Sequence, residues 1–113
     1  MIIIMEGDIS MELYKDISSL ELNNMIGNKE KLILLDVRTK AEYNTGRIPN
    51  SVNIPVGDLD AQIEQLLPYK DEKIILYCRS GKRSVYAAHL LSEYGFKHLY
   101  NLKQGIIGHL SYL

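Results

Sequence analysis

Two runs of apolar residues constrain the fold of this chain more than any other feature. They are KLILLDV at residues 31–37 and EKIILYC at residues 72–78. Neither run alternates between apolar and polar residues, as a strand with one solvent-exposed face would. A continuous apolar strand is typical of a parallel sheet that is covered on both faces. The sequence therefore predicts two central strands of such a sheet.

The segments around these runs carry helical patterns. Ser18 with Glu21, and Thr39 with Glu42, each form an S/T-x-x-E capping box, which predicts that a helix begins at each point. Apolar residues at helical spacing and stop residues predict further helices over residues 57–67, 84–94 and 104–113. Alternating strands and helices indicate an α/β fold, with a central, mostly parallel sheet and helices on both faces.

Length and composition indicate one globular domain. The chain has 113 residues, of which 46% are hydrophobic and 24% are charged. Its formal net charge of -1 gives no general attraction to nucleic acid or to an anionic membrane. The single cysteine excludes an internal disulfide, a zinc–cysteine cluster and a CxxC redox pair. No metal or cofactor is expected, because the three histidines share no ligand spacing and no phosphate-binding glycine loop is present.

The N-terminus is apolar, but the apolar stretch is short. Acidic residues follow residues 1–5 at once and no basic leader is present, which indicates neither a signal peptide nor a membrane span. A cytoplasmic location is therefore expected. Residues 1–10 are expected to form a loose arm before a single domain over 11–113, and Met5 and Met11 are alternative starts.

Cys78 ends the second apolar run and precedes the polar, cationic loop at residues 79–83. Ligands of parallel sheets gather beyond the C-terminal ends of the strands, so a site is expected here. The loop can turn its N–H groups inward as an anion cradle, with Gly81 allowing the tight path. The next helix is expected to begin around Arg83 or Ser84, with its positive end toward the thiol. These features favour a reactive thiolate over an inert buried cysteine.

Loop length separates the chemistries that share a strand–cysteine–loop–helix arrangement. Cysteine-dependent phosphatases have the pattern Cys, five residues, Arg, but here Ser84 holds the arginine's place and Arg83 comes one residue early. The shorter loop suits a small charged group on sulfur, such as a persulfide. A phosphatase or an arsenate reductase is therefore less favoured, and the lack of a second cysteine argues against a disulfide-relay reductase.

Together these segments resemble the single-domain rhodaneses, the thiosulfate sulfurtransferases, from about Tyr14 to Gly108. LLDVRTKAEYNTGRIPNSVNIP is similar to the family pattern D-V-R-x-x-x-E-[FY]-x-x-G-H-I-P-x-A-x-N-I-P, and CRSGKRS is similar to its C-x-x-G-x-R-S loop. LLSEYGF and LYNLKQGI match further family segments. The resemblance implies a rhodanese-like α/β fold.

The resemblance also implies a catalytic role for Cys78. Its thiolate would attack the outer sulfur of a donor such as thiosulfate, release sulfite and carry the sulfur as a persulfide. A thiol, a protein or cyanide would then accept the sulfur, in a reaction with ping-pong kinetics. The implied substrate-binding residues, whose amides hold the persulfide and whose cations bind the sulfonate end of the donor, are Arg79, Ser80, Gly81, Lys82 and Arg83.

Other motif positions carry further expectations. Arg38 and Glu42 lie four residues apart and are expected to form an ion pair. Ser84 is expected to cap the helix after the loop, and its hydroxyl could reach the loop. Arg47 replaces the family histidine and either faces the site mouth or is a solvated turn residue. The other departures from the family pattern are at Asn50, Ser51, Gln104 and His109.

Two functions are compatible with these residues. One is an enzyme with a catalytic persulfide, and the other is a non-enzymatic sulfur carrier that a partner enzyme loads. The chemistry at the cysteine is the same in both, so the sequence leaves them open. It also leaves open the physiological donor and acceptor and the oligomeric state.

Overall fold

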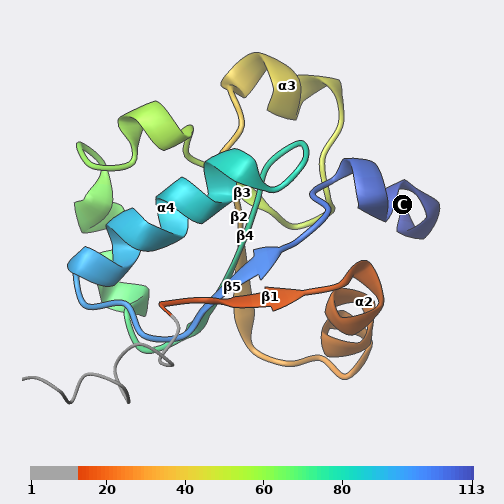
Figure 1. The fold of residues 1–113 in the computed structure, drawn as a ribbon, viewed down its shortest axis with the longest axis horizontal. Helices are drawn as coiled ribbons and strands as arrows, with labels where there is room; N and C mark the ends of the chain where they lie inside the picture. The colour runs from red at the N-terminus through yellow and green to blue at the C-terminus, as the bar shows by residue number, and fades with distance from the viewer. Residues whose placement is uncertain (1–12) are drawn as a thin grey trace, which may run out of the picture.

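A computed structural model describes residues 13–113, and the expected arm at residues 1–10 lies outside this range. One five-stranded sheet, with every neighbouring pair parallel, runs in the order β1-β5-β4-β2-β3 (Figure 1). The strands are β1 (Lys15–Ile17), β2 (Leu32–Asp36), β3 (Val52–Asn53), β4 (Lys73–Tyr77) and β5 (Leu99–Leu102). The two apolar runs form β2 and β4, which pair with each other inside the sheet.

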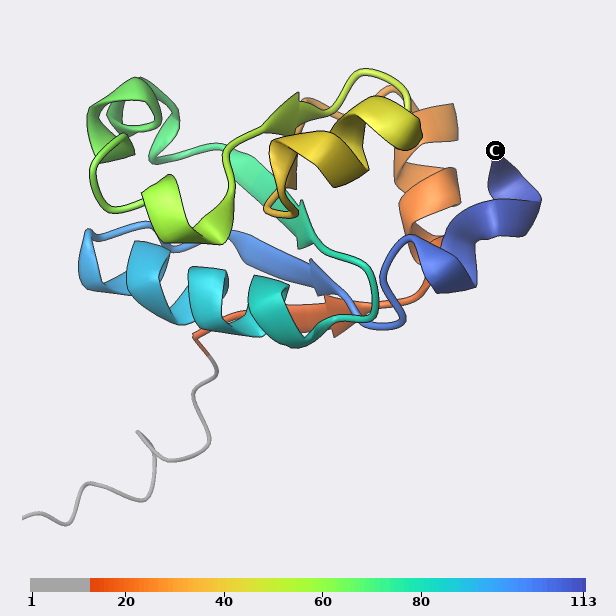
Figure 2. The same ribbon diagram turned by 90° about the horizontal axis from the view of Figure 1, so that it is seen from above.

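Helical segments cover both faces of the sheet. The α-helices of the described range are α2 (Ser19–Gly27), α3 (Lys40–Thr45) and α4 (Lys82–Glu93), and its 3-10 helices are η1 (Val56–Asp58), η2 (Ile63–Gln65), η3 (Leu67–Tyr69) and η4 (Ile107–Tyr112). Figures 1 and 2 show α4 beside the segment that holds η1 to η3, and α2 beside η4 at the C-terminus. Both predicted capping boxes are formed, at the starts of α2 and α3.

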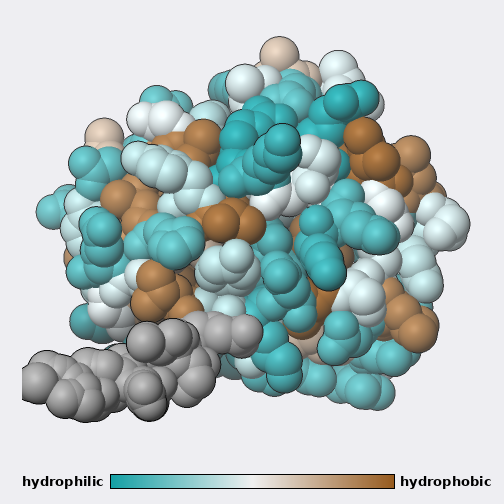
Figure 3. All heavy atoms as spheres, viewed as in Figure 1, coloured by the Kyte–Doolittle hydropathy of each residue, from teal (hydrophilic) through white to brown (hydrophobic). Residues whose placement is uncertain are grey.

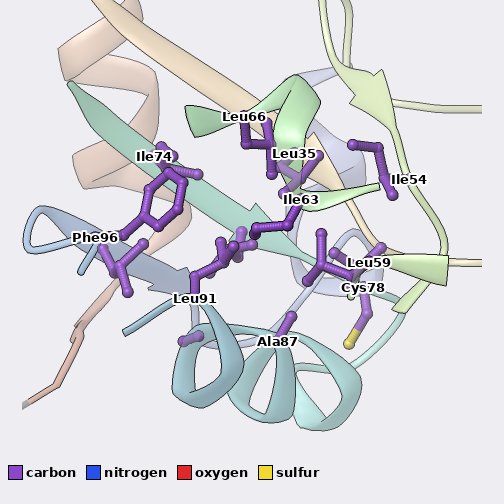
Figure 4. Close-up of a cluster of buried hydrophobic side chains, with 14 residues drawn as sticks. Leu35, Ile54, Leu59, Ile63, Leu66, Ile74, Cys78, Ala87, Leu91 and Phe96 are labelled. Atoms are coloured by element: carbon purple, nitrogen blue, oxygen red, sulfur yellow. The ribbon is translucent and has the colours of Figure 1, made fainter. Parts of the chain in front are cut away.

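The two faces of the sheet have separate hydrophobic clusters, which explains the continuous apolar runs. Alternate residues of β4 point to opposite faces, so Ile74 belongs to the first cluster and Ile75 to the second. Both side chains are 0% exposed. Figure 4 shows the first cluster, between the sheet, α4 and the η1–η3 segment, with Cys78 at one end of it.

Two predicted helices take a different form. Residues 57–67 were expected to form one α-helix, but the segment from Val56 to Tyr69 contains the three short 3-10 helices. Leu59, Ile63 and Leu66 are buried as their spacing predicts, yet glycine and aspartate disfavour a continuous helix here. The C-terminal segment forms η4, a 3-10 helix, because Gly105 and Gly108 weaken an α-helix in the same way.

On the face drawn in Figure 3, hydrophobic residues are scattered among hydrophilic ones. Scattered apolar residues of this kind are usual on a globular protein and mark no site by themselves. Within residues 13–113, no helix has both the length and the apolar character needed to cross a membrane.

Candidate active site

Cys78 lies directly after β4, at the C-terminal end of an inner strand, as the sequence predicts. Its side chain is only 1% exposed and belongs to the rim of the first hydrophobic cluster. In Figure 4 its sulfur is turned toward the side of the cluster that α4 covers. The thiol therefore lies between an apolar core and the polar loop that leads into α4.

Gly81 shapes this loop. Its φ of 101° is left-handed, and it is the N-cap residue of α4, with no side chain that caps the helix. Its backbone N–H donates a hydrogen bond to Cys78 Sγ at 3.1 Å. A Cβ at this position would collide with the backbone carbonyl oxygen of Lys103. Glycine is therefore needed here for both conformation and space.

The start of α4 differs from the expectation. The helix begins at Lys82, one residue before the expected start, but Ser84 does not cap it. Ser84 lies in the first turn and is fully buried. Its Oγ lies 3.5 Å from Cys78 Sγ, which confirms that the hydroxyl reaches the loop. Without a side-chain cap, the first N–H groups of α4 remain available to a ligand.

Opposing effects act on the pKa of the Cys78 thiol. Burial raises this pKa, because it disfavours the charged thiolate. Hydrogen bonds from Ser84 and from the backbone N–H groups of Gly81 and Ser80 lower it. The hydrogen bonds prevail, so the pKa lies below its ordinary value. The loop thus favours the nucleophilic form of the sulfur.

The segment after β5 supports the loop from the other side. Backbone N–H groups of Ile106 and Ile107 donate to the carbonyl oxygens of Cys78 and Arg79, at 2.9 and 3.2 Å. Gly105 has a φ of 66°, and a Cβ there would collide with the backbone at Arg79. In the sequence, Gly105 lies in the family segment LYNLKQGI, directly after Gln104. A glycine in a family segment is the sequence signal that the backbone comes close to another segment here.

The predicted ion pair between Arg38 and Glu42 is wrong. Arg38 instead pairs with the fully buried Asp36, with 2.6 Å between Nη2 and Oδ2, and also donates to the carbonyl oxygen of Gly46 at 2.7 Å. The buried carboxylate of Asp36 requires a partner, and Arg38 is the nearest cation in the chain. Arg38 is therefore a structural residue, as expected, but with another partner.

Glu42 pairs with Arg83. The two guanidinium nitrogens Nη1 and Nη2 donate to the two carboxylate oxygens at 2.7 and 2.9 Å. This pair ties α3 to the first turn of α4. The hydrogen bond from Arg83 lowers the pKa of Glu42 to about 2, so Glu42 is ionised at neutral pH. Arg83 is at the site, as predicted, but its charge is already paired.

The remaining cations of the motif lie on the surface. Arg79 and Ser80 are exposed on the loop, and Lys82 is exposed at the start of α4. Arg47 is also exposed, and its guanidinium lies 4.4 Å from the centre of the Tyr43 ring on α3. Of its two expected environments, this geometry matches the solvated turn. No group of residues within 13–113 has the composition and proximity of a metal site.

Sequence reasoning missed Asn101. Ser84 Oγ donates to Asn101 Oδ1 at 2.5 Å, and Asn101 Nδ2 donates to Asp16 Oδ1 at 2.9 Å. Asn101 is 2% exposed and lies in β5, among the apolar residues of LYNL. A polar residue inside a buried strand requires a hydrogen-bond partner, and that was the available signal.

A model of a known protein family covers most of the chain. The model of the Rhodanese-like domain family matches residues 18–108. This chain belongs to the rhodanese-like family. The predicted family and fold class are therefore confirmed.

Individual relatives of this rhodanese-like domain have different names. A sulfurtransferase of Allochromatium vinosum is 33% identical over 95 residues, which are 84% of this chain and 87% of the relative. A tRNA uridine(34) hydroxylase of Buchnera aphidicola is 36% identical over 95 residues, but the match spans only 30% of that longer protein. The crystal structure of a rhodanese-related protein from Thermoplasma volcanium has a TM-score of 0.76 and 30% identity, and the match covers 88% of this chain and 93% of that one.

Proposed function

We propose that this rhodanese-like domain is a sulfurtransferase. It moves sulfane sulfur from thiosulfate or a similar donor to a thiol or cyanide acceptor, through a persulfide on Cys78. The observation that carries this proposal is the uncapped start of α4, where backbone N–H groups face the sulfur of the single cysteine. An anionic sulfur bound to Cys78 Sγ would extend toward those N–H groups.

The first half-reaction loads the cysteine. The Cys78 thiolate attacks the outer sulfur of thiosulfate and forms an S–S bond to it. The S–S bond of thiosulfate breaks, and its electron pair leaves with sulfite. Because the loop lowers the pKa of the thiol, this step requires no general base. The negative charge of the persulfide then lies on its outer sulfur, where the amide cradle stabilises it.

The exposed cations of the loop are proposed to recognise the donor. Arg79 and Lys82 flank the cradle and would attract the sulfonate end of thiosulfate. Arg83 has a different proposed role, because Glu42 already binds two of its guanidinium nitrogens. It neutralises Glu42, which would otherwise repel an anionic donor.

The second half-reaction unloads the cysteine. The acceptor, as a thiolate or cyanide, attacks the outer sulfur of the persulfide. The bond between that sulfur and Sγ breaks, and the electron pair returns to Sγ as the Cys78 thiolate. A cytoplasmic site of action is part of the proposal, since thiol acceptors are kept reduced in that compartment.

Steady-state assays with thiosulfate and cyanide test the proposed function. Formation of thiocyanate with parallel double-reciprocal plots, abolished in Cys78→Ser, supports the enzyme. Negligible turnover together with rapid sulfur uptake from a cysteine desulfurase would instead favour the carrier function. Cys78-dependent hydrolysis of an aryl phosphate would contradict both.

A further inference from the structure

The single hydroxyl proton of Ser84 lies between two acceptors. Ser84 Oγ is 2.5 Å from Asn101 Oδ1 and 3.5 Å from Cys78 Sγ. All three side chains are at most 2% exposed, so they are shielded from bulk solvent. A hydroxyl donates only one hydrogen bond at a time. The short contact with Asn101 therefore competes directly with the contact to the sulfur.

Asp16 fixes the direction of this competition. Its carboxylate can only accept, so the Asn101 amide turns its Nδ2 toward Asp16, at 2.9 Å. The carbonyl oxygen of Asn101 must then face Ser84. Since a carbonyl oxygen cannot donate, Ser84 gives its proton to Asn101 while Cys78 is a thiol, and offers a lone pair to the S–H group. It can donate to the thiolate only by giving up the hydrogen bond to Asn101.

We propose that Asn101, oriented by Asp16, is a positioning residue that holds the Ser84 proton away from Cys78 and so limits how far the thiolate is stabilised. The thiol form gains from this arrangement, because S–H can donate to the Ser84 lone pair. The thiolate gains less, because Ser84 can donate to sulfur only by leaving Asn101. The consequence for sulfur transfer rests on the function proposed above.

Other charged groups surround the cysteine loop and stay unchanged in the test below. Those on the elements packed against it are Arg79 and Lys82 on the loop and α4, Arg83 on α4, Glu42 on α3, Asp36 and Arg38 at the end of β2, Lys103 after β5 and His109 in η4. Within the described residues, none of their side chains is hydrogen-bonded to Ser84 or Asn101. Replacing Asp16 with a neutral residue could therefore change the thiol pKa in two ways, by removing a negative charge and by freeing the Asn101 amide to turn.

Limiting the stability of the thiolate has opposite effects on the two half-reactions. A less stabilised thiolate is the better nucleophile when it attacks the outer sulfur of the donor. It is the poorer leaving group when the acceptor breaks the bond between Sγ and the outer sulfur. Asn101 therefore balances the loading of Cys78 against its unloading.

The pH dependence of Cys78 alkylation by iodoacetamide tests the proposal in Asp16→Asn and Asn101→Leu. In Asp16→Asn the Asn101 amide can turn its N–H toward Ser84, and in Asn101→Leu the acceptor is absent. In both, Ser84 is expected to donate to the thiolate and lower the apparent thiol pKa by about one unit, the equivalent of one hydrogen bond. Asp16 is exposed on an edge strand, so Asp16→Asn retains the test if Asn101→Leu does not fold.

The same measurement in a Ser84→Ala protein separates the effect of the Ser84 hydrogen bond from that of the Asp16 charge. In Ser84→Ala, the Asp16→Asn substitution is expected to shift the thiol pKa by less than half as much. An equal shift with and without Ser84, or an unchanged pKa in both single variants, would overturn the proposal. Alkylation needs no sulfur donor, so this result is independent of whether thiosulfate is a substrate.

Transient kinetics give the second readout. For a fully ionised thiol, a fall of one pKa unit predicts about threefold slower loading by thiosulfate and faster release of sulfur to cyanide. A substitution that only damages the structure of the site would slow both loading by thiosulfate and release to cyanide. Such a parallel loss in a folded variant would also contradict the proposal.

Discussion

At the scale of single residues, the reactivity of Cys78 depends on backbone geometry. Gly81 supplies an N–H at 3.1 Å from Sγ, and Gly105 lets the segment after β5 approach the loop. Neither glycine carries chemistry of its own. Each has a positive φ and a neighbouring carbonyl in the space where a Cβ would lie. The nucleophile is thus prepared by residues whose contribution is the absence of a side chain.

Gly81→Ala tests the role of this geometry. The left-handed φ of 101° and the collision with Lys103 are expected to lower the free energy of unfolding by about 1–3 kcal/mol. Sulfur transfer should fall more than stability accounts for, because the N–H moves away from Sγ. Urea denaturation and thiocyanate formation measure the two effects. Gly57→Ala is the matched control, since its Cβ meets no atom within 4 Å and no change in activity is expected.

At the scale of elements, the Arg83–Glu42 pair connects α3 with the start of α4. Glu42 also forms the capping box of α3, so one carboxylate serves both helices. The sequence indicated the capping box, because its partners are three residues apart. It did not indicate the ion pair, because spacing within one segment says nothing of a partner 41 residues away.

Arg83→Ala is expected to raise the KM for thiosulfate about tenfold and to change kcat less. The substitution leaves the Glu42 carboxylate unneutralised beside the binding site for an anion, an effect on ground-state binding of about 1–2 kcal/mol. In the double variant Glu42→Gln/Arg83→Ala, much of the KM increase should disappear. An unchanged KM in Arg83→Ala would show that neither residue affects donor binding.

Glu42→Gln tests the stability of the same connection. The pKa of Glu42 in the folded chain is about 2, below its ordinary 4.5, so the pair stabilises the fold above pH 4.5 and this contribution is lost as the pH falls toward 2. The free energy of unfolding of the variant at pH 7 should therefore be about 1 kcal/mol lower. The difference should shrink between pH 4.5 and 2, as measured by urea denaturation. If the difference in unfolding free energy stays constant between pH 4.5 and 2, the effect of the substitution comes from packing and not from the ion pair.

At the scale of the whole molecule, the sheet holds two hydrophobic clusters apart and presents the cysteine loop at one end. The continuous runs of β2 and β4 predicted the parallel sheet, since each run fills both clusters. Residues 57–67 were harder to predict. Burial of Leu59, Ile63 and Leu66 fixes their spacing, but a string of 3-10 helices provides that spacing as well as an α-helix does. The role of Asn101 depends on neighbours in β1 and α4, which only the tertiary structure brings together.

Adjacent residues of β4 test the two clusters. Ile74→Ala and Ile75→Ala each remove a side chain that is 0% exposed, from opposite faces, and each should cost about 2–5 kcal/mol of unfolding free energy. Both variants should unfold in a single transition, because the clusters share one sheet. Leu20→Ala, at a side chain that is 56% exposed, should change stability by less than about 0.5 kcal/mol. Two separate transitions would mean that the clusters are not coupled.

The mass of the intact protein after incubation with thiosulfate tests the persulfide on Cys78 most directly. We predict a gain of one sulfur atom, located on the peptide that contains Cys78, absent in Cys78→Ser and removed by cyanide with formation of one equivalent of thiocyanate. Turnover of thiosulfate while Cys78 never carries the added sulfur would contradict the mechanism. So would a gain of sulfur that cyanide cannot remove.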